Sequence, residues 1–204
     1  MAGSPGLWAA WGEFGKYNAQ GMKGGEALIL ELNRIVYTSG ISSPVTSKRG
    51  MNARLRYLNS AKGREAMREQ GITDRAMKNW YKGKVSPSAE NRQKIDNAYW
   101  TRRRENLIRS GWLKRHLDNN GRGRQVEIYP VDERNVPEPR RRTTGTRRDL
   151  TNRSITVRYL WGALVDAWAA QDEDLMDEIW DDVISDLDSD YTAYAYVSAV
   201  GIGA

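Results

Sequence analysis

The side chains best suited to recognise a ligand in this chain are five polar residues at helical spacing: Thr73, Asp74, Arg75, Lys78 and Asn79. In the major groove of DNA, arginine pairs with guanine and asparagine with adenine, each through two hydrogen bonds. Thr73 comes first in the group, where its hydroxyl can cap the free amides of a helix. The sequence therefore predicts a short helix that contacts the bases of duplex DNA through these five residues.

Two helices joined by a glycine turn would present these residues to solvent. Residues 66–83 have the sequence AMREQGITDRAMKNWYKG, in which Gly71 supplies the turn. The pattern predicts one helix over 62–70 and a second over 74–82, which together form a helix-turn-helix. Apolar residues recur at helical spacing on the side of the second helix that would pack inward: Ile72, Met77, Trp80 and Tyr81.

Further lysines and arginines suit phosphate contacts, which position a protein on DNA without reading its sequence. We expect this role for the following residues, with plain solvated surface as the alternative: Lys82, Lys84, Arg102, Arg103, Arg104, Arg140, Arg141 and Arg142. Residues 48–158 hold 29 Lys/Arg and 12 Asp/Glu, a net charge of +17, whereas 159–204 hold 11 Asp/Glu and no Lys or Arg. The middle of the chain is therefore the part that a polyanion attracts.

Residues common in enzyme centres are scarce. The chain has one histidine, His116, and no cysteine, which excludes Cys/His catalysis and the usual zinc sites. No phosphate-binding GxxxxGK[ST] loop is present. Asp177, Asp181 and Asp182 lie on neighbouring turns of an acidic helix, for which a solvated face is favoured over Mg²⁺ binding. We therefore expect no enzyme activity, no metal and no cofactor.

The sequence also favours one cellular compartment. No stretch approaches eighteen consecutive apolar residues, and the N-terminus lacks the basic and apolar pattern of a secretory signal. The absence of cysteine fits a reducing cytoplasm. We expect a cytoplasmic, nucleoid-associated protein that does not bind membranes.

Composition divides the chain into three parts. We expect an appendage, a helical DNA-binding domain and a small mixed domain at residues 1–50, 51–118 and 119–204. The appendage holds one helix at 24–38, followed by a Ser/Gly/Pro linker, and Met51 offers an internal start of translation. Ser86-Pro87 predicts the start of a long helix that runs to Ser110 in the second part, with serine as its N-cap.

The third part alternates between strand and helix patterns. Period-two alternation predicts strands at 125–129 and 154–159, and a segment rich in aromatic and β-branched residues predicts a third at 191–202. Helical spacing predicts helices at 161–170 and 173–187, the second of them acidic on its outer face. We expect an antiparallel sheet packed on these two helices, and hence an α+β chain. Prolines and arginines indicate a flexible basic loop at 130–153.

The segment GITDRAMKNWYKG, with a basic helix containing LRYL before it and a long basic helix after it, resembles two groups of proteins. One comprises the terminal proteins that protect the telomeres of actinobacterial linear chromosomes and plasmids. The other comprises short helix-turn-helix transcriptional regulators of actinobacterial mobile elements. The resemblance covers residues 51–204 and is close only at 71–83, through Arg75, Trp80, Lys82 and Gly83. Met67 and Gln70 depart from it, since alanine and leucine are usual there.

The resemblance implies binding to telomeric DNA, a role in DNA replication with a partner protein, and covalent attachment to a DNA 5′ end. Attachment needs a hydroxyl, for which the candidates in the basic loop are Thr143, Thr144, Thr146, Thr151 and Ser154. Transcriptional regulation is one alternative function. Another is self-association through the acidic C-terminal domain, whose Trp161, Trp168 and Trp180 are either core anchors or an interface.

Overall fold

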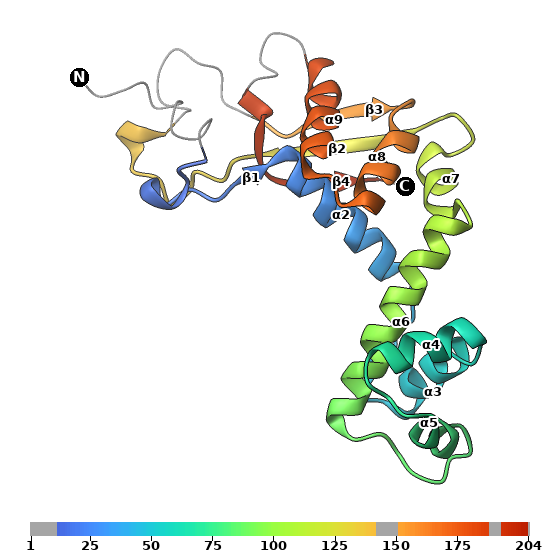
Figure 1. Cartoon of the computed structure of the whole chain (residues 1–204). Helices are drawn as coiled ribbons and strands as arrows, with labels where there is room; N and C mark the ends of the chain where they lie inside the picture. Colours follow the sequence, from blue (N-terminus) through green and yellow to red (C-terminus); the bar gives the residue numbers. More distant parts are fainter. Residues whose placement is uncertain (1–11, 142–150, 188–192, 204) are drawn as a thin grey trace. The chain divides into compact units, whose positions relative to one another are not determined.

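The computed structural model of the chain describes residues 12–141, 151–187 and 193–203 (Figure 1). The chain divides into two compact units, one of Met1–Asn33 with Leu113–Ala204 and the other of Arg34–Trp112. We call the first the sheet unit and the second the helical unit.

The described part of the sheet unit contains a four-stranded antiparallel sheet in the order β1-β4-β2-β3. The strands are β1 (Met22–Lys23), β2 (Arg124–Pro130), β3 (Arg153–Val157) and β4 (Tyr196–Ile202). The helices are α8 (Trp161–Ala170), α9 (Glu173–Ser185), most of α2 (Gly24–Thr38) and of α7 (Trp112–Asp118), and the 3₁₀ turns η1 (Gly15–Tyr17) and η2 (Glu138–Arg140). The predicted α+β class is therefore confirmed.

One face of the sheet is covered and the other faces solvent. In β2, Val126 and Ile128 are buried while Gln125 and Glu127 are exposed, as the period-two pattern requires. The three tryptophans of α8 and α9, Trp161, Trp168 and Trp180, are also buried. Their indole N–H groups donate hydrogen bonds within the unit. The sequence left open whether these tryptophans are core anchors or an interface. Their burial shows that they are core anchors.

Residues 12–50 are not an appendage, in contrast to the sequence-based expectation for residues 1–50. β1 pairs with β4 through Met22 and Val197. In α2, the buried Glu31 accepts a hydrogen bond from the backbone N–H of Ile202 at 2.9 Å. Residues 34–50 belong instead to the helical unit. A strand of two residues shows no alternation, so the sequence pattern gave no sign of β1.

The prediction of a flexible loop at 130–153 is wrong for the first part of that range. Val131 and Val136 are buried with Ala19 in a small separate core. The arginines around them suggested a solvated loop, but the two valines supply enough apolar surface to pack it. Residues 142–150 lie outside the described residues.

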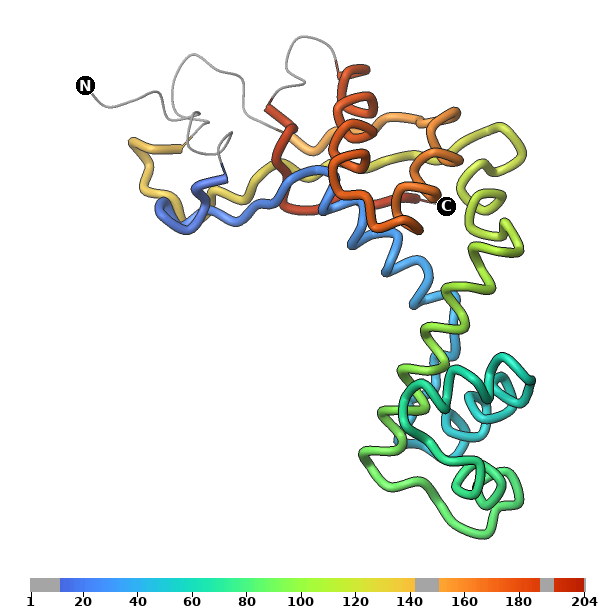
Figure 2. Tube along the Cα trace, in the orientation of Figure 1, coloured from blue at the N-terminus to red at the C-terminus, as the bar shows by residue number. Residues whose placement is uncertain are grey.

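The helical unit contains four helices that each begin at a capped residue. They are α3 (Lys48–Tyr57), α4 (Ala61–Glu69), α5 (Asp74–Tyr81) and α6 (Ala89–Arg109). In every case a serine or threonine hydroxyl accepts a hydrogen bond from an amide three residues later. The capping residues are Ser47, Ser60, Thr73 and Ser88. α3 and α4 pack against α6 (Figure 2).

The long helix α6 begins two residues later than the sequence predicted. Ser88, not Ser86, is its N-cap, and Pro87 is buried just before the cap instead of lying in the first turn. Both serines can cap a helix, and burial of the proline ring decides between them. The helix ends at Arg109, and Gly111 with φ +64° separates it from α7.

The segment predicted as a linker at 39–50 is packed within the helical unit. The hydroxyl of Tyr99 accepts a hydrogen bond from the backbone N–H of Ile41 at 2.9 Å. Gly50 lies so near the chain that a Cβ there would be 2.0 Å from the carbonyl oxygen of Pro44. The Ser/Gly/Pro composition therefore reflects close backbone packing and not a flexible connection.

Candidate nucleic-acid interface

The turn between α4 and α5 positions the predicted base-contacting residues. Gly71 has φ +76°, and no atom lies within 4 Å of an added Cβ, so the backbone conformation alone favours glycine. The hydroxyl of Thr73 accepts a hydrogen bond from the amide of Ala76 at 3.3 Å. Both helices lie within one residue of their predicted bounds.

The inner face of α5 is fixed in the core of the helical unit. Met77 and Trp80 are 2% and 8% exposed, and Ile72 in the turn is 3% exposed. These three residues pack in one cluster with Met67 of α4. Because one face of this eight-residue helix is held inward, the opposite face must point to solvent.

The outer face of α5 and the residues after it carry cations. Arg75, Lys78, Lys82 and Lys84 are exposed. Within the part of the chain that the structure describes, their side chains form no hydrogen bond or ion pair. Asn79 is half-buried at the edge of the same face. Because these ammonium and guanidinium groups have no internal partner, they are available to an external anion.

The charge of the helical unit supports the same view of this surface. Residues 34–112 hold 18 Lys/Arg and 6 Asp/Glu, a net charge of +12, whereas the whole chain has +6. The remaining residues therefore carry −6, which the net charge of the chain conceals. A polyanion is attracted to the helical unit in particular.

Asp74 is the exception on this face. Its carboxylate accepts a hydrogen bond from Nε of Arg68 in α4 at 2.9 Å, and both side chains are more than half exposed. This ion pair connects the helices on either side of the turn. Asp74 is thus partly neutralised by Arg68, a partner that the sequence analysis did not identify.

Two of the three consecutive arginines in α6 are used within the helical unit. Arg102 forms an ion pair with Glu105, and its side chain is only 11% exposed. Arg103 donates hydrogen bonds to the carbonyl oxygen and the hydroxyl of Ser39. Arg104 is half-buried. Their expected role as a phosphate-contacting patch therefore does not fit Arg102 and Arg103.

The second predicted arginine run belongs to the sheet unit. The guanidinium of Arg140 lies 5.2 Å from the ring centre of Tyr17. Arg141 donates a hydrogen bond to the carbonyl oxygen of Val136 at 2.8 Å. Both arginines therefore contact their own unit, and Arg142 lies outside the described residues.

The candidate acceptor hydroxyls are only partly described. Thr143, Thr144 and Thr146 lie outside the described residues. Thr151 is exposed, and the hydroxyl of Ser154 accepts a hydrogen bond from the side-chain amide of Gln125 at 2.5 Å. An amide cannot remove a proton, so Gln125 does not activate the Ser154 hydroxyl.

His116 lies in α7 of the sheet unit. Its backbone carbonyl accepts hydrogen bonds from the guanidinium of Arg124 at 2.7 and 2.9 Å. Partial burial, and next the charge of Arg124, lower the pKa of the imidazole below its ordinary value. Among the described residues, no three His, Asp or Glu side chains are grouped so that they could hold a metal ion.

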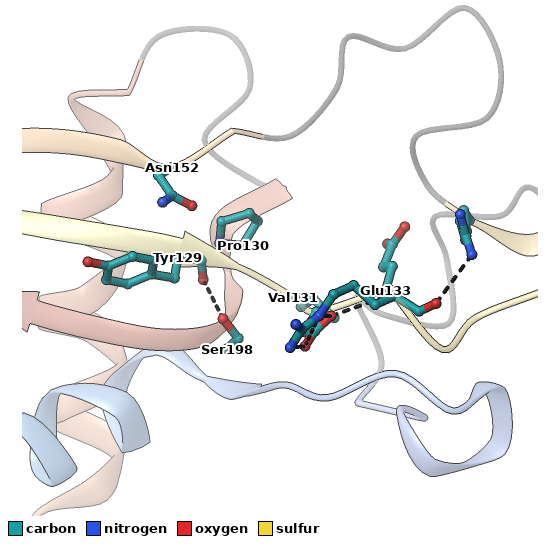
Figure 3. Close-up of a pocket in the computed structure, with 9 residues that line it drawn as sticks. Tyr129, Pro130, Val131, Glu133, Asn152 and Ser198 are labelled. Carbon is teal, nitrogen blue, oxygen red and sulfur yellow. Dashed lines mark hydrogen bonds and ion pairs between the residues drawn. The ribbon is translucent and has the colours of Figure 1, made fainter. Parts of the chain in front are cut away.

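A shallow hollow of about 420 Å³ lies in the sheet unit, beside the end of β2 (Figure 3). Its lining includes Tyr129, Ser198 and an ion pair between Asp132 and Arg134 at 2.7 Å. Ser198 donates a hydrogen bond to the carbonyl oxygen of Tyr129 at 3.4 Å. Since these polar groups interact with one another, the hollow offers a ligand fewer unpaired polar groups than the outer face of α5 does.

Comparisons with known proteins assign no family. No protein-family model, curated protein or solved structure matches this chain. In the described residues, no helix combines the length and apolar character needed to cross a membrane. The function must therefore be inferred from the surface itself.

Proposed function

We propose that the helical unit binds double-stranded DNA, with α5 in the major groove as the second helix of a helix-turn-helix. The observation that carries this proposal is the pair Arg75 and Lys78, which are exposed and have no partner among the described residues, on a helix whose opposite face is buried. An α-helix with its side chains is about 10–12 Å across, which matches the width of the major groove.

The residues of this surface take different roles in the proposal. Arg75 pairs with guanine and Asn79 with adenine, since their side chains match those base edges. Thr73 and Lys78 complete the contacts with the groove. Lys82 and Lys84 neutralise phosphates and set the position of α5 on the duplex. Arg102 and Arg103 are left out because their guanidinium groups are already engaged.

The biological use of this binding is proposed from the resemblance of residues 71–83. It is protection and priming at the ends of linear actinobacterial replicons, and the alternative is transcriptional regulation on a mobile element. Protein that stays attached to replicon ends after denaturation and phenol extraction would favour the first use. Release of all protein would favour the second. Both uses require the same contact between α5 and duplex DNA.

Binding-site selection with the full chain tests the proposal. A pool of random duplexes is enriched by the protein, and the affinity for the enriched sequence is then measured by fluorescence anisotropy. Arg75→Ala should weaken specific binding by about 1–3 kcal/mol and relax selectivity at one base pair. Arg122→Ala is the matched control, because it removes the same charge at an exposed position of the sheet unit. Equal losses for both variants would refute a reading role for α5.

A further inference from the structure

The end of α5 is fixed by a turn that joins it to a basic loop. The backbone N–H of Gly83 donates to the carbonyl of Trp80, and that of Lys84 to the carbonyl of Asn79, each at 3.0 Å. With Gly83 at φ +65°, these two bonds form the Schellman arrangement that ends many helices. The backbone of Lys84 therefore lies against that of Asn79, the proposed adenine-contacting residue.

This turn lacks the apolar contact that usually accompanies it. In a Schellman turn, an apolar residue after the glycine commonly packs on the last helical turn. Here those two positions hold Lys84 and Asn79, both polar. The next residue, Val85, is 58% exposed and does not fill that role. Every residue from 82 to 86 is exposed, and the loop ends at the buried Pro87.

Single exposed apolar residues are common on protein surfaces, so exposure alone carries no function. Val85 differs through its position. It follows Lys82 and Lys84, whose side chains have no partner in the described part of the chain, and the backbone of Lys84 is hydrogen-bonded to that of Asn79. When Lys82 and Lys84 contact phosphates at the rim of the major groove, the exposed Val85 is the next residue of the chain, so its side chain can reach a base edge beside α5. The apolar group that DNA offers there is the C5-methyl of thymine.

We propose that Val85 contacts a thymine methyl group at the edge of the DNA site and thereby determines part of its sequence. This inference rests on the proposed binding of duplex DNA through α5. It adds a base pair beyond those assigned to Arg75 and Asn79, on the side where the chain leaves the helix.

Replacing thymine with uracil removes the methyl group and leaves every hydrogen-bonding group of the base in place. The duplex selected by the full chain is therefore prepared with uracil at each thymine in turn, and its affinity is measured with the parent chain and with Val85→Ser. At one position, uracil should lower the affinity of the parent chain roughly fourfold, the value for one buried methyl-sized group. Val85→Ser should bind the thymine duplex with an affinity lowered by a similar factor. It should bind the uracil duplex as tightly as the parent chain binds that duplex.

Leu175→Ser is the matched control, because it also replaces an exposed apolar residue but lies in α9 of the sheet unit. It should bind every duplex as the parent chain does. Independent effects of uracil and Val85→Ser would multiply as factors in affinity, whereas a shared contact is lost only once. The inference is overturned if the two factors multiply at every position, or if Val85→Ser binds as tightly as the parent chain. Failure of the full chain to select any duplex would overturn the DNA-binding proposal and this inference together. Selection of a site without coupling at Val85 would overturn only the inference.

Discussion

Arg54 of α3 forms an ion pair with Asp96 of α6 inside the helical unit, where Arg54 is only 4% exposed. The same guanidinium donates hydrogen bonds to the carbonyl oxygens of Ser43 at 2.8 Å and Gly50 at 3.2 Å. It also lies 5.3 Å from the ring centre of Tyr99. One side chain thus connects α3, α6 and the segment before α3. Residues of α3 and α6 pack in the same core cluster as those of α4 and α5.

Removal of this arginine should destabilise the helical unit strongly. Arg54→Ala leaves Asp96 without its partner and removes the guanidinium hydrogen bonds to two carbonyl oxygens, and breaking a buried pair in this way costs about 3–5 kcal/mol. Urea denaturation followed by circular dichroism measures the loss. Arg122→Ala, at an exposed position, should change the free energy of unfolding by less than about 0.5 kcal/mol. A small loss for Arg54→Ala would show that the ion pair is not a structural connection.

Local patterns predicted the α4–α5 pair to within one residue, because its signals lie close together in sequence. Gly71 favours the turn, Thr73 caps α5, and the spacing of Met77 and Trp80 sets its inner face. No sequence pattern indicated β1, since two residues cannot show a period. The division into units was also hidden, because Leu113–Ala204 joins Met1–Asn33 across the chain.

The candidate site was predictable for the side chains that have no internal partner. Arg75 and Lys78 are exposed, as helical spacing requires. Arg103 was assigned to phosphate because its partner Ser39 lies 64 residues away, a distance at which no pattern reveals a contact. Arg54 was not singled out at all, since its neighbours come from three separate segments.

The carboxylate of Asp74 should limit non-specific binding. It is the acidic side chain of α5, on a face otherwise carrying Arg75 and Lys78, and it is only partly neutralised by the exposed Arg68. Asp74→Asn should therefore raise the affinity for a scrambled duplex a few-fold at low salt and that for the selected duplex by less, which narrows the ratio between them. Anisotropy titrations with both duplexes measure the ratio. A loss confined to the selected duplex would show instead that Asp74 accepts a hydrogen bond from cytosine.

Lys84 and Arg103 should respond differently to removal, although the sequence suggested the same role for both. Lys84→Ala removes a cation without an internal partner, so the slope of log affinity against log salt should fall by about 0.9 for every duplex. Arg103→Ala removes hydrogen bonds to Ser39, so it should lower the unfolding temperature and leave the slope unchanged. Salt titrations and thermal melts of both variants give the two quantities. Equal slopes for the two variants would place Arg103 at the DNA after all.

Asp132 should keep its charge at an unusually low pH. The side chain of Arg134, and next its backbone amide, hydrogen-bond to the carboxylate and lower its pKa from 3.8 to about 2. Because the pKa is lower in the folded chain, the stabilisation is present above about pH 4 and is lost as the pH falls toward 2. The backbone of Asp132 also pairs with that of Gln20 through hydrogen bonds of 2.9 and 3.0 Å, so the carboxylate lies where the two chain segments of the sheet unit meet.

Arg134→Ala tests the cause of this low pKa. The variant should raise the pKa of Asp132 most of the way to 3.8, since the side-chain hydrogen bonds are lost while the backbone amide at position 134 still donates at 3.0 Å. Carboxyl-carbon NMR titration of the full chain measures the pKa directly. Arg122→Ala should leave it unchanged, because Asp132 owes its shift to Arg134. An unaltered pKa in Arg134→Ala would assign the shift to the backbone amide alone, and acid unfolding of the variant would then follow that of the parent chain.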